Sequence, residues 1–353
     1  TSERARLLIF MKKTKPLDSK PLPCYNVIEV FFMKRVLIID ALNMFLRAFI
    51  VDPSLSQHGQ PIGGIKGSIK ILQKLVRQTQ PSEIVICWDG PNGSQKRKAL
   101  NSNYKEGRKP LRLNRSVHNL TENEELKNKI WQQMRIIEYL NQMPIIQLVL
   151  ERVEADDIIS YVCNSGHYKG WQKVIVSNDK DFLQLCDEET VVYRPTTDRV
   201  ETAKSVICTL GIHPNNMALA RAMAGDSSDN LPGVNRVGLK TIANRLPFMR
   251  EEHSVTIDEL LEYCDNKESK LKVYGNISKS KQIIEHNYKM MQLYSPLISV
   301  QGKQTIDYSL QNFECDFNKT ELLRLMIEDG FGELNWEELK VFLNKISREC
   351  NEK

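Results

Sequence analysis

Short apolar runs rich in β-branched residues alternate with stretches of helical periodicity between residue 33 and about residue 210. We expect strands where these runs fall, at 36–39, 84–88, 145–149, 174–177 and 191–193. We expect helices between them, at 65–78, 121–141 and 154–163. This alternation predicts an α/β fold with a mostly parallel sheet and flanking helices.

The same pattern divides the chain into segments. Residues 1–32 are rich in Lys and Pro, so we expect an N-terminal extension outside the fold, with Met33 as the natural start. The α/β pattern covers 33–210 and includes a stretch of weak periodicity at about 91–120. The pattern is helical over 211–310 and in a C-terminal tail, 311–353. In the tail we expect amphipathic helices whose apolar faces pack on the core: Leu322, Leu323, Met326 and Ile327, then Trp336, Leu339, Phe342 and Leu343.

Composition excludes several classes of protein. The chain has 353 residues, of which 41% are hydrophobic and 26% charged, as in ordinary globular proteins and unlike disordered chains. No apolar run approaches the ~18 residues of a membrane span. The eight cysteines form no C-x-x-C pair, which argues against a disulfide scaffold and a zinc site. We therefore expect a cytoplasmic protein in a reducing compartment.

Positive charge is concentrated in one place. Residues 94–115 hold eight Lys or Arg and one Glu, whereas the chain as a whole has a net charge of +5. Most charge runs are solvated loops. The alternative is a strip that follows a phosphate backbone. Composition alone leaves both interpretations open.

Acidic residues follow four of the predicted strands. They are Asp40, Asp89, the group Glu154, Asp156 and Asp157, and the pair Asp179 and Asp181. Taken singly, each is explained by a helix cap, a helix dipole or a turn. Because parallel strands end at a shared edge, where ligands bind in open sheets, we expect these acids to converge.

Repulsion within such a cluster predicts bound cations. Two like charges ~4 Å apart repel by roughly 4 kcal/mol at an effective dielectric constant of ~20. All the candidate ligands are hard oxygen atoms, which favours Mg²⁺, with Mn²⁺ able to replace it, over zinc. The number of carboxylates favours two ions, as in phosphodiester chemistry.

A further block extends the acidic set. Asp226 and Asp229 lie in AGDSSDNLPG and precede a turn bracketed by Gly233 and Gly238. Backbone N–H groups at the start of the helix that follows are able to hold a phosphate. An ordinary helix hairpin packed on the core explains the turn equally well when it is taken alone.

Together these motifs resemble the 5′-nuclease (flap endonuclease) superfamily, which includes stand-alone bacteriophage 5′-3′ exonucleases, called phage ribonuclease H, and the 5′-3′ exonuclease domain of bacterial DNA polymerase I. The similar stretches are VLIID ending at Asp40, WDG at 88–90, EADD at 154–157, NDKDF at 178–182, GDSSDNLPG at 225–233, and Tyr104-Lys105-x-x-Arg108. The resemblance covers about residues 33–250.

The resemblance implies a PIN-like nuclease domain over 33–210, with the basic stretch at about 91–120 as an arch, and a helix-three-turn-helix DNA-binding region over 211–310. Lys105 and Arg108 would contact the scissile phosphate, Tyr104 would stack on a base, and Arg97 would steer phosphate. One metal ion would be held by Asp40, Asp89, Glu154 and Asp156. A second would be held by Asp179, Asp181 and Asp229, with support from Asp157 and Asp226.

The turn would bind the duplex backbone through Gly233, Val234, Arg236, Gly238, Lys240 and Thr241, and relatives also bind a K⁺ ion there. One position departs from the family, because relatives commonly have glycine where this chain has Arg236.

The function implied is a divalent-metal-dependent 5′-3′ exonuclease and flap endonuclease that removes RNA primers or flaps during DNA replication. Its partners would be DNA and RNA–DNA hybrids with a 5′ end or flap, and the protein would be a monomer with no membrane contact. The stand-alone likeness suggests a phage gene. A docking site in the tail for a single-strand-binding protein or another replication factor is an alternative to core packing.

The motifs argue against three other functions. A catalytically inactive binder of branched DNA would be expected to lose some of the acids. A PIN-type ribonuclease acting on RNA alone has no need of a duplex-binding turn. A magnesium phosphotransferase would not need the basic stretch.

Overall fold

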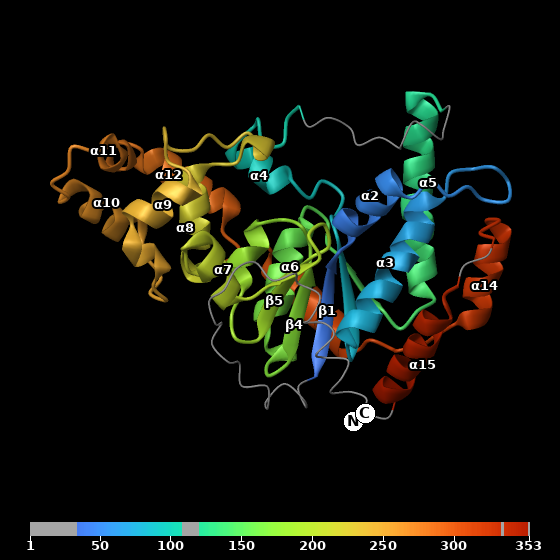
Figure 1. The fold of residues 1–353 in the computed structure, drawn as a ribbon. Helices are drawn as coiled ribbons and strands as arrows, with labels where there is room; N and C mark the ends of the chain where they lie inside the picture. Colours follow the sequence, from blue (N-terminus) through green and yellow to red (C-terminus); the bar gives the residue numbers. More distant parts are fainter. Residues whose placement is uncertain (1–33, 108–119, 333–334, 352–353) are drawn as a thin grey trace, which may run out of the picture.

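A six-stranded sheet lies at the centre of the computed structural model, which describes residues 34–107, 120–332 and 335–351 (Figure 1). The strands are β1 (Arg35–Asp40), β2 (Glu83–Trp88), β3 (Ile146–Val149), β4 (Gln172–Val176), β5 (Thr190–Arg194) and β6 (Arg199–Glu201). Their order is β3-β2-β1-β4-β5-β6, and all pairs are parallel except β5 with β6. This confirms the mostly parallel sheet. The antiparallel edge strand β6 was not predicted, because its three residues carry no apolar run.

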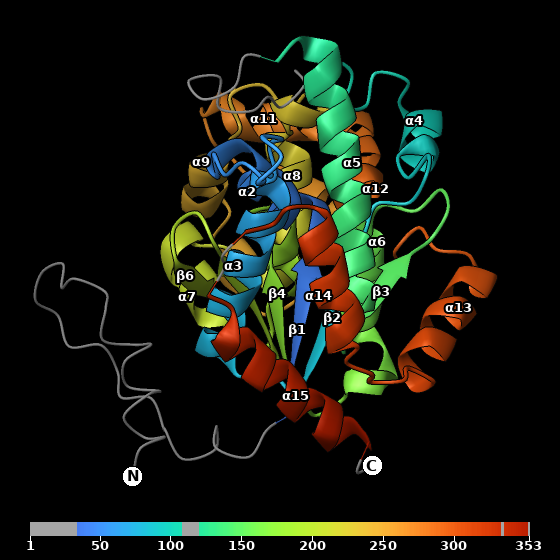
Figure 2. The ribbon, with the colours of Figure 1, turned by 90° about the vertical axis from the view of Figure 1, so that its right-hand side faces the viewer.

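Alternating side chains of β1 explain why helices cover both faces of the sheet. Leu37 and Ile39 point into one core cluster, and Val36 and Ile38 point into another. The first face is covered by α2 (Ala41–Val51), α3 (Gly63–Thr79), α5 (Glu122–Asn141), α14 (Lys319–Glu328) and α15 (Glu337–Asn351), as Figures 1 and 2 show. The second face is covered by α6 (Ala155–Asn164), α7 (Ala203–Leu210) and α13 (Val300–Gln311).

A helical region continues the core of the second face. It comprises α8 (Pro214–Ala224), α9 (Leu239–Arg245), α10 (Ile257–Asp265), α11 (Lys272–Ser278) and α12 (Lys281–Met291), at the upper left of Figure 1. Its buried residues, such as Met217, Ile242 and Ile284, belong to the same cluster as Val36 and Ile38. The sheet and the helical region are therefore packed together.

Short elements complete the described chain. They are α4 (Gln95–Leu100) in the basic stretch and the 3₁₀ helices η1 (Gly166–Tyr168), η2 (Asp181–Leu185), η3 (Ser227–Asp229) and η4 (Pro247–Arg250). No helix in the described ranges is long and apolar enough to cross a membrane. Residues 1–32 lie outside these ranges, and the proposed domain boundaries stay predictions.

One local expectation was wrong. Ile327 was placed on the packed face of its helix, but 78% of the residue is exposed. The cysteines of the described ranges do not form a disulfide scaffold: Cys315 is in a disulfide, while Cys87, Cys163, Cys186, Cys208 and Cys264 are free thiols.

Candidate active site

Six of the predicted acids line one cleft at the carboxyl edge of the sheet. The cleft has a volume of about 190 Å³ and is also lined by Arg97, Tyr104 and Lys105. Asp40 ends β1, Asp89 follows β2 and Asp179 follows β4. Asp156 lies on α6, Asp181 on η2 and Asp229 on η3. Residues up to 189 positions apart in the sequence thus share one site, because parallel strands end at the same edge.

Two of these acids also accept hydrogen bonds from the backbone at the start of a helix. The Oδ1 atom of Asp40 accepts a hydrogen bond from the backbone N–H of Asn43 at 3.0 Å, at the start of α2, and its Oδ2 accepts from the Ser177 hydroxyl at 3.0 Å. Asp89 accepts from the backbone N–H of Ala155 at 2.8 Å, at the start of α6. The capping interpretation and the cleft interpretation therefore both hold for Asp40. Asp89 is not the N-cap of the helix that follows its strand and instead contacts the start of α6 from a distant segment.

Burial and mutual repulsion disfavour ionisation in the cleft. Burial raises the pKa of Asp40 to about 6, and the charges of Asp89 and Asp179 add to this. Burial also raises the pKa of Asp156, reinforced by Asp179 and Asp40. Burial and Asp179 raise the pKa of Asp181 to about 6, against the effect of Arg221. A bound cation would relieve this repulsion.

Glu154 and Asp157, predicted as metal ligands, do not line the cleft. Both are buried, and both form ion pairs with Arg97. The distance from Arg97 Nη1 to Asp157 Oδ2 is 2.8 Å. Asp157 also accepts from the backbone N–H of Leu297 at 2.9 Å. Glu154 is further paired with Lys105, at 2.5 Å from Nζ to Oε1. Their charges are compensated by protein cations in this structure, so Glu154 as a ligand and Asp157 as a supporting residue stay predictions.

Asp226 is occupied in a similar way. It accepts hydrogen bonds from Arg221 Nη2 at 2.6 Å and from the backbone N–H of Ser228 at 2.8 Å, at the start of η3. It does not line the cleft and it anchors the loop, and its supporting role at the metal site stays a prediction.

Arg97 was expected to steer phosphate, and the structure buries it. It is only 4% exposed. Besides its two ion pairs, its Nε donates to the backbone carbonyl of Met290 at 3.0 Å. A guanidinium buried among these partners is not available to a phosphate backbone.

Tyr104 and Lys105 lie side by side but differ in exposure. The Tyr104 ring is buried with Leu231, Met290 and Met291 at the cleft, and its stacking on a base stays a prediction. Lys105 is partly exposed and reaches the cleft. Burial lowers its pKa, but Glu154 outweighs this effect and raises it, so the ammonium group stays charged. The predicted partner Arg108 lies outside the described residues.

The glycine turn places two backbones in contact. A Cβ on Gly233 would lie 2.1 Å from the carbonyl oxygen of Ala224, and one on Gly225 would lie 2.3 Å from the Gly233 nitrogen. Val234, expected to bind DNA, is buried, and its N–H donates to Met223 O at 2.8 Å. Val234 therefore has only backbone atoms with which to contact DNA.

The rest of the turn is open to solvent. Arg236 is exposed and has a φ of +61°, the left-handed conformation that glycine favours, so the departure from glycine preserves the turn. Gly238 and Lys240 are also exposed, and Thr241 is half-buried.

In the described ranges, no three His, Cys, Asp or Glu side chains are arranged as a ready-made metal centre. Arg221 pairs with Asp181 at 2.7 Å as well as with Asp226. Sequence reasoning missed Arg221. It lies four residues before the glycine of the GDSSDN stretch, and nothing in its own surroundings indicates a partner 40 residues earlier.

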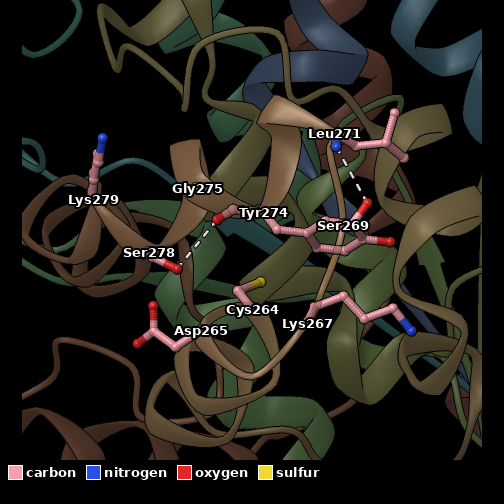
Figure 3. A pocket seen from close by; sticks show the side chains of 9 residues that line it. All are labelled: Cys264, Asp265, Lys267, Ser269, Leu271, Tyr274, Gly275, Ser278 and Lys279. Atoms are coloured by element: carbon pink, nitrogen blue, oxygen red, sulfur yellow. Dashed lines mark hydrogen bonds between the residues drawn. The ribbon is translucent and has the colours of Figure 1, made fainter.

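A larger hollow, of about 470 Å³, lies between α10 and α11 (Figure 3). It is lined by one carboxylate, Asp265, and by Lys267 and Lys279 among other residues. It contains none of the predicted site residues and too few anionic oxygens for the expected chemistry. The smaller acidic cleft is therefore the candidate active site.

Comparisons with known proteins agree with the motifs. The family model described as "5′-3′ exonuclease, N-terminal resolvase-like domain" matches residues 35–211. The chain is 28% identical over 331 residues to a 5′-3′ exonuclease of Aquifex aeolicus, covering 91% of this chain and 99% of that one. It is 31% identical over 211 residues to a 5′-3′ exonuclease of Buchnera aphidicola, and the match covers 59% of this chain and 68% of that one.

Solved structures share the fold. The T5 D15 protein co-crystallised with metal ions aligns with a TM-score of 0.60 at 17% identity, covering 83% of this chain and 99% of that one. A complex of the T5 D15 flap endonuclease with DNA and metal ions aligns with a TM-score of 0.61 at 17% identity, with the same coverage. On the family match and the identity to its relatives, the chain belongs to the 5′-3′ exonuclease family.

Proposed function

We propose that this protein is a divalent-metal-dependent 5′-3′ exonuclease and flap endonuclease. It would hydrolyse phosphodiesters at 5′ ends and flap–duplex junctions and remove RNA primers or flaps during replication. The observation that carries this proposal is the cleft in which six carboxylates face Lys105, in a chain of this family.

The donor set fits two Mg²⁺ ions, with Mn²⁺ as a substitute, because every candidate ligand is a carboxylate oxygen. Asp40, Asp89 and Asp156 would hold one ion, and Asp179, Asp181 and Asp229 the other. The raised pKa values of Asp40, Asp156 and Asp181 support a site that needs cations. When bound, such ions supply an activated water and stabilise the leaving oxygen.

The protein's own cations would orient the substrate. Lys105 is partly exposed in the cleft and carries a charge that Glu154 partly compensates. A scissile phosphate would share this ammonium group and gain stabilisation as its negative charge develops. Arg97 would keep Glu154 in place while this happens. The corresponding role of Arg108 stays a prediction.

Duplex binding is proposed at the turn 233–238 and the start of α9. The exposed Arg236 and Lys240 support phosphate contacts, and Thr241 and the backbone N–H groups would add to them. A K⁺ ion at this turn, binding of RNA–DNA hybrids, a monomeric state, a replication partner and a phage origin all stay predictions.

Cleavage of a 5′-labelled flap duplex tests the proposal. With Mg²⁺ the wild type is expected to cut near the junction, and chelation is expected to abolish cutting. Asp179→Asn should slow cleavage about 100-fold, because it removes a carboxylate that would hold one of the ions. Asp265→Asn is the matched control, since Asp265 is an exposed acid in the other hollow and should leave the rate unchanged.

The same assay separates the alternatives. Cutting that survives chelation, or an unchanged rate for Asp179→Asn, would refute the metal assignment. Tight flap binding without cutting would indicate an inactive branched-DNA binder. Cutting confined to single-stranded RNA would indicate a PIN-type ribonuclease.

A further inference from the structure

A strap of residues, 290–297, runs from the end of α12 past the acidic cleft. Met290, Met291 and Leu293 line the cleft beside the acids. Met290 and Met291 also pack with Tyr104 from the basic stretch and Leu231 from the loop that carries Asp229. The strap therefore contacts the α/β part and the helical part of the site at once.

We propose that Gln184 is a positioning residue that fixes this strap to the acidic loop of η2, and thereby sets the separation of the two halves of the metal site. The proposal rests on the proposed function, because it assigns a role toward the same acids. Gln184 itself does not line the cleft.

The hydrogen bonds of Gln184 carry the proposal. Its side chain is buried, and its Nε2 donates to the backbone carbonyls of Asp181 at 2.8 Å and Met291 at 3.1 Å. Its Oε1 accepts from the backbone N–H of Leu293 at 2.8 Å. One amide thus joins the backbone of a predicted metal ligand to two strap residues. A carboxamide is suited to this task because it offers two donors and an acceptor.

Further side chains of the α/β part hold the strap along its length. Arg97 donates to the carbonyl of Met290, and Asp157 accepts from the N–H of Leu297. The Ser160 hydroxyl donates to the carbonyl of Leu293. These bonds start from buried positions, so the strap is held to a rigid support.

Asn287, on α12 just before the strap, links the strap to the loop that carries Asp229. It is 1% exposed, and its Nδ2 donates to the carbonyls of Ala222 and Pro232, both at 2.9 Å. Those two residues flank the loop that carries Asp226 and Asp229. A shift of the strap relative to Gln184 would therefore shift Asp229 relative to Asp181.

Gln184→Met tests the proposal, because methionine has similar length but makes no such hydrogen bonds. We expect Mg²⁺ affinity, measured by calorimetry on the full chain without DNA, to fall about tenfold or more, as when groups that orient metal ligands are removed. The kcat for flap cleavage should fall as well, while KM for the flap duplex stays unchanged.

Gln132→Met is the matched control. Gln132 is also fully buried, donates to the Pro61 carbonyl at 2.8 Å and accepts from the Ile65 N–H at 3.2 Å, but lies on α5, outside the cleft. Both variants should lower the melting temperature, and only Gln184→Met should weaken Mg²⁺ binding. Equal effects on Mg²⁺ affinity, or none in Gln184→Met, would overturn the proposal.

Ser160→Ala covers the case in which Gln184→Met does not fold. It removes the hydrogen bond from Ser160 to the strap and should weaken Mg²⁺ binding, but by less than Gln184→Met does. Unchanged affinity in this variant would also count against the proposal. If the wild type neither binds Mg²⁺ nor cuts, the proposed function fails. If the wild type does both and the variants match it, only the positioning role fails.

Discussion

At the scale of the residue, Arg97 shows what the sequence conceals. It lies between Lys96 and Lys98 in the basic stretch, and both of these neighbours are exposed whereas Arg97 is buried. Its carboxylate partners lie 57 and 60 residues later in the chain. Local composition could not distinguish the three side chains, because only the tertiary structure brings the partners together.

Removing this guanidinium should cost stability. Arg97→Gln would leave the buried carboxylates of Glu154 and Asp157 without their main partner. We expect the free energy of unfolding, measured by urea denaturation, to fall by about 3–5 kcal/mol.

Arg324→Gln provides the comparison, because Arg324 pairs with Glu321 at 2.7 Å on the exposed side of α14. Exposed ion pairs contribute little to the free energy of unfolding, so the urea midpoint of Arg324→Gln should hardly differ from that of the wild type. Equal small losses in both variants would contradict the structural role given to Arg97.

At the scale of the element, apolar runs predicted the strands well. The runs at 36–39, 84–88 and 174–177 became the buried strands β1, β2 and β4. Burial on both faces makes such strands continuously apolar, which is a strong signal. The helix expected at 65–78 formed as α3 (Gly63–Thr79). The short α4 was not foreseen, because six polar-rich residues carry no clear period.

The glycine turn was recognised from sequence, but the reason for its glycines was not. Gly233 and Gly225 are required by the close approach of two backbones. This approach holds the loop with Asp226 and Asp229 against the end of α8. Sequence spacing indicated a turn, whereas the contact that requires glycine is visible only in three dimensions.

A methyl group at Gly233 should therefore disturb the site. In Gly233→Ala the new Cβ would meet the Ala224 carbonyl oxygen at 2.1 Å, so the backbones must separate. We expect a lower melting temperature and a loss of flap cleavage larger than the loss of folded protein, because Asp229 moves with the loop. Circular dichroism and the flap assay measure the two effects.

Gly275→Ala is the control for this prediction. Gly275 lies in α11, and a Cβ there would meet nothing within 4 Å. Alanine should leave stability unchanged or raise it by up to about 1 kcal/mol, because it favours the helix. An unaltered melting temperature in Gly233→Ala would show that the backbones separate freely.

At the scale of the whole molecule, topology made the convergence of the acids predictable. Six of the nine predicted acids line the cleft, because strand ends meet at one edge. Sequence could not separate these six from Glu154, Asp157 and Asp226. That distinction depends on where Arg97, Lys105 and Arg221 lie, and each comes from a distant segment.

Crowded acids should make stability depend on the metal. Mg²⁺ at about 100 times its Kd is expected to raise the free energy of unfolding by roughly 2.7 kcal/mol, measured as a rise in melting temperature over the chelated protein. Asp156→Asn should raise the melting temperature of the chelated protein, because it removes a buried charge near Asp40 and Asp179. It should also reduce the Mg²⁺-dependent rise. A Mg²⁺-dependent rise as large as that of the wild type would exclude Asp156 from the ligands.

The double role of Asp40 has a practical consequence for genetics. Its carboxylate caps the start of α2 as well as lining the cleft, so an alanine there removes a cleft charge and a helix cap together. Asparagine preserves the cap, since it is among the favoured residues at a helix start. An amide replacement is thus the cleaner tool for dissecting this position, and a natural relative that has lost its acids while keeping its shape should carry asparagine here.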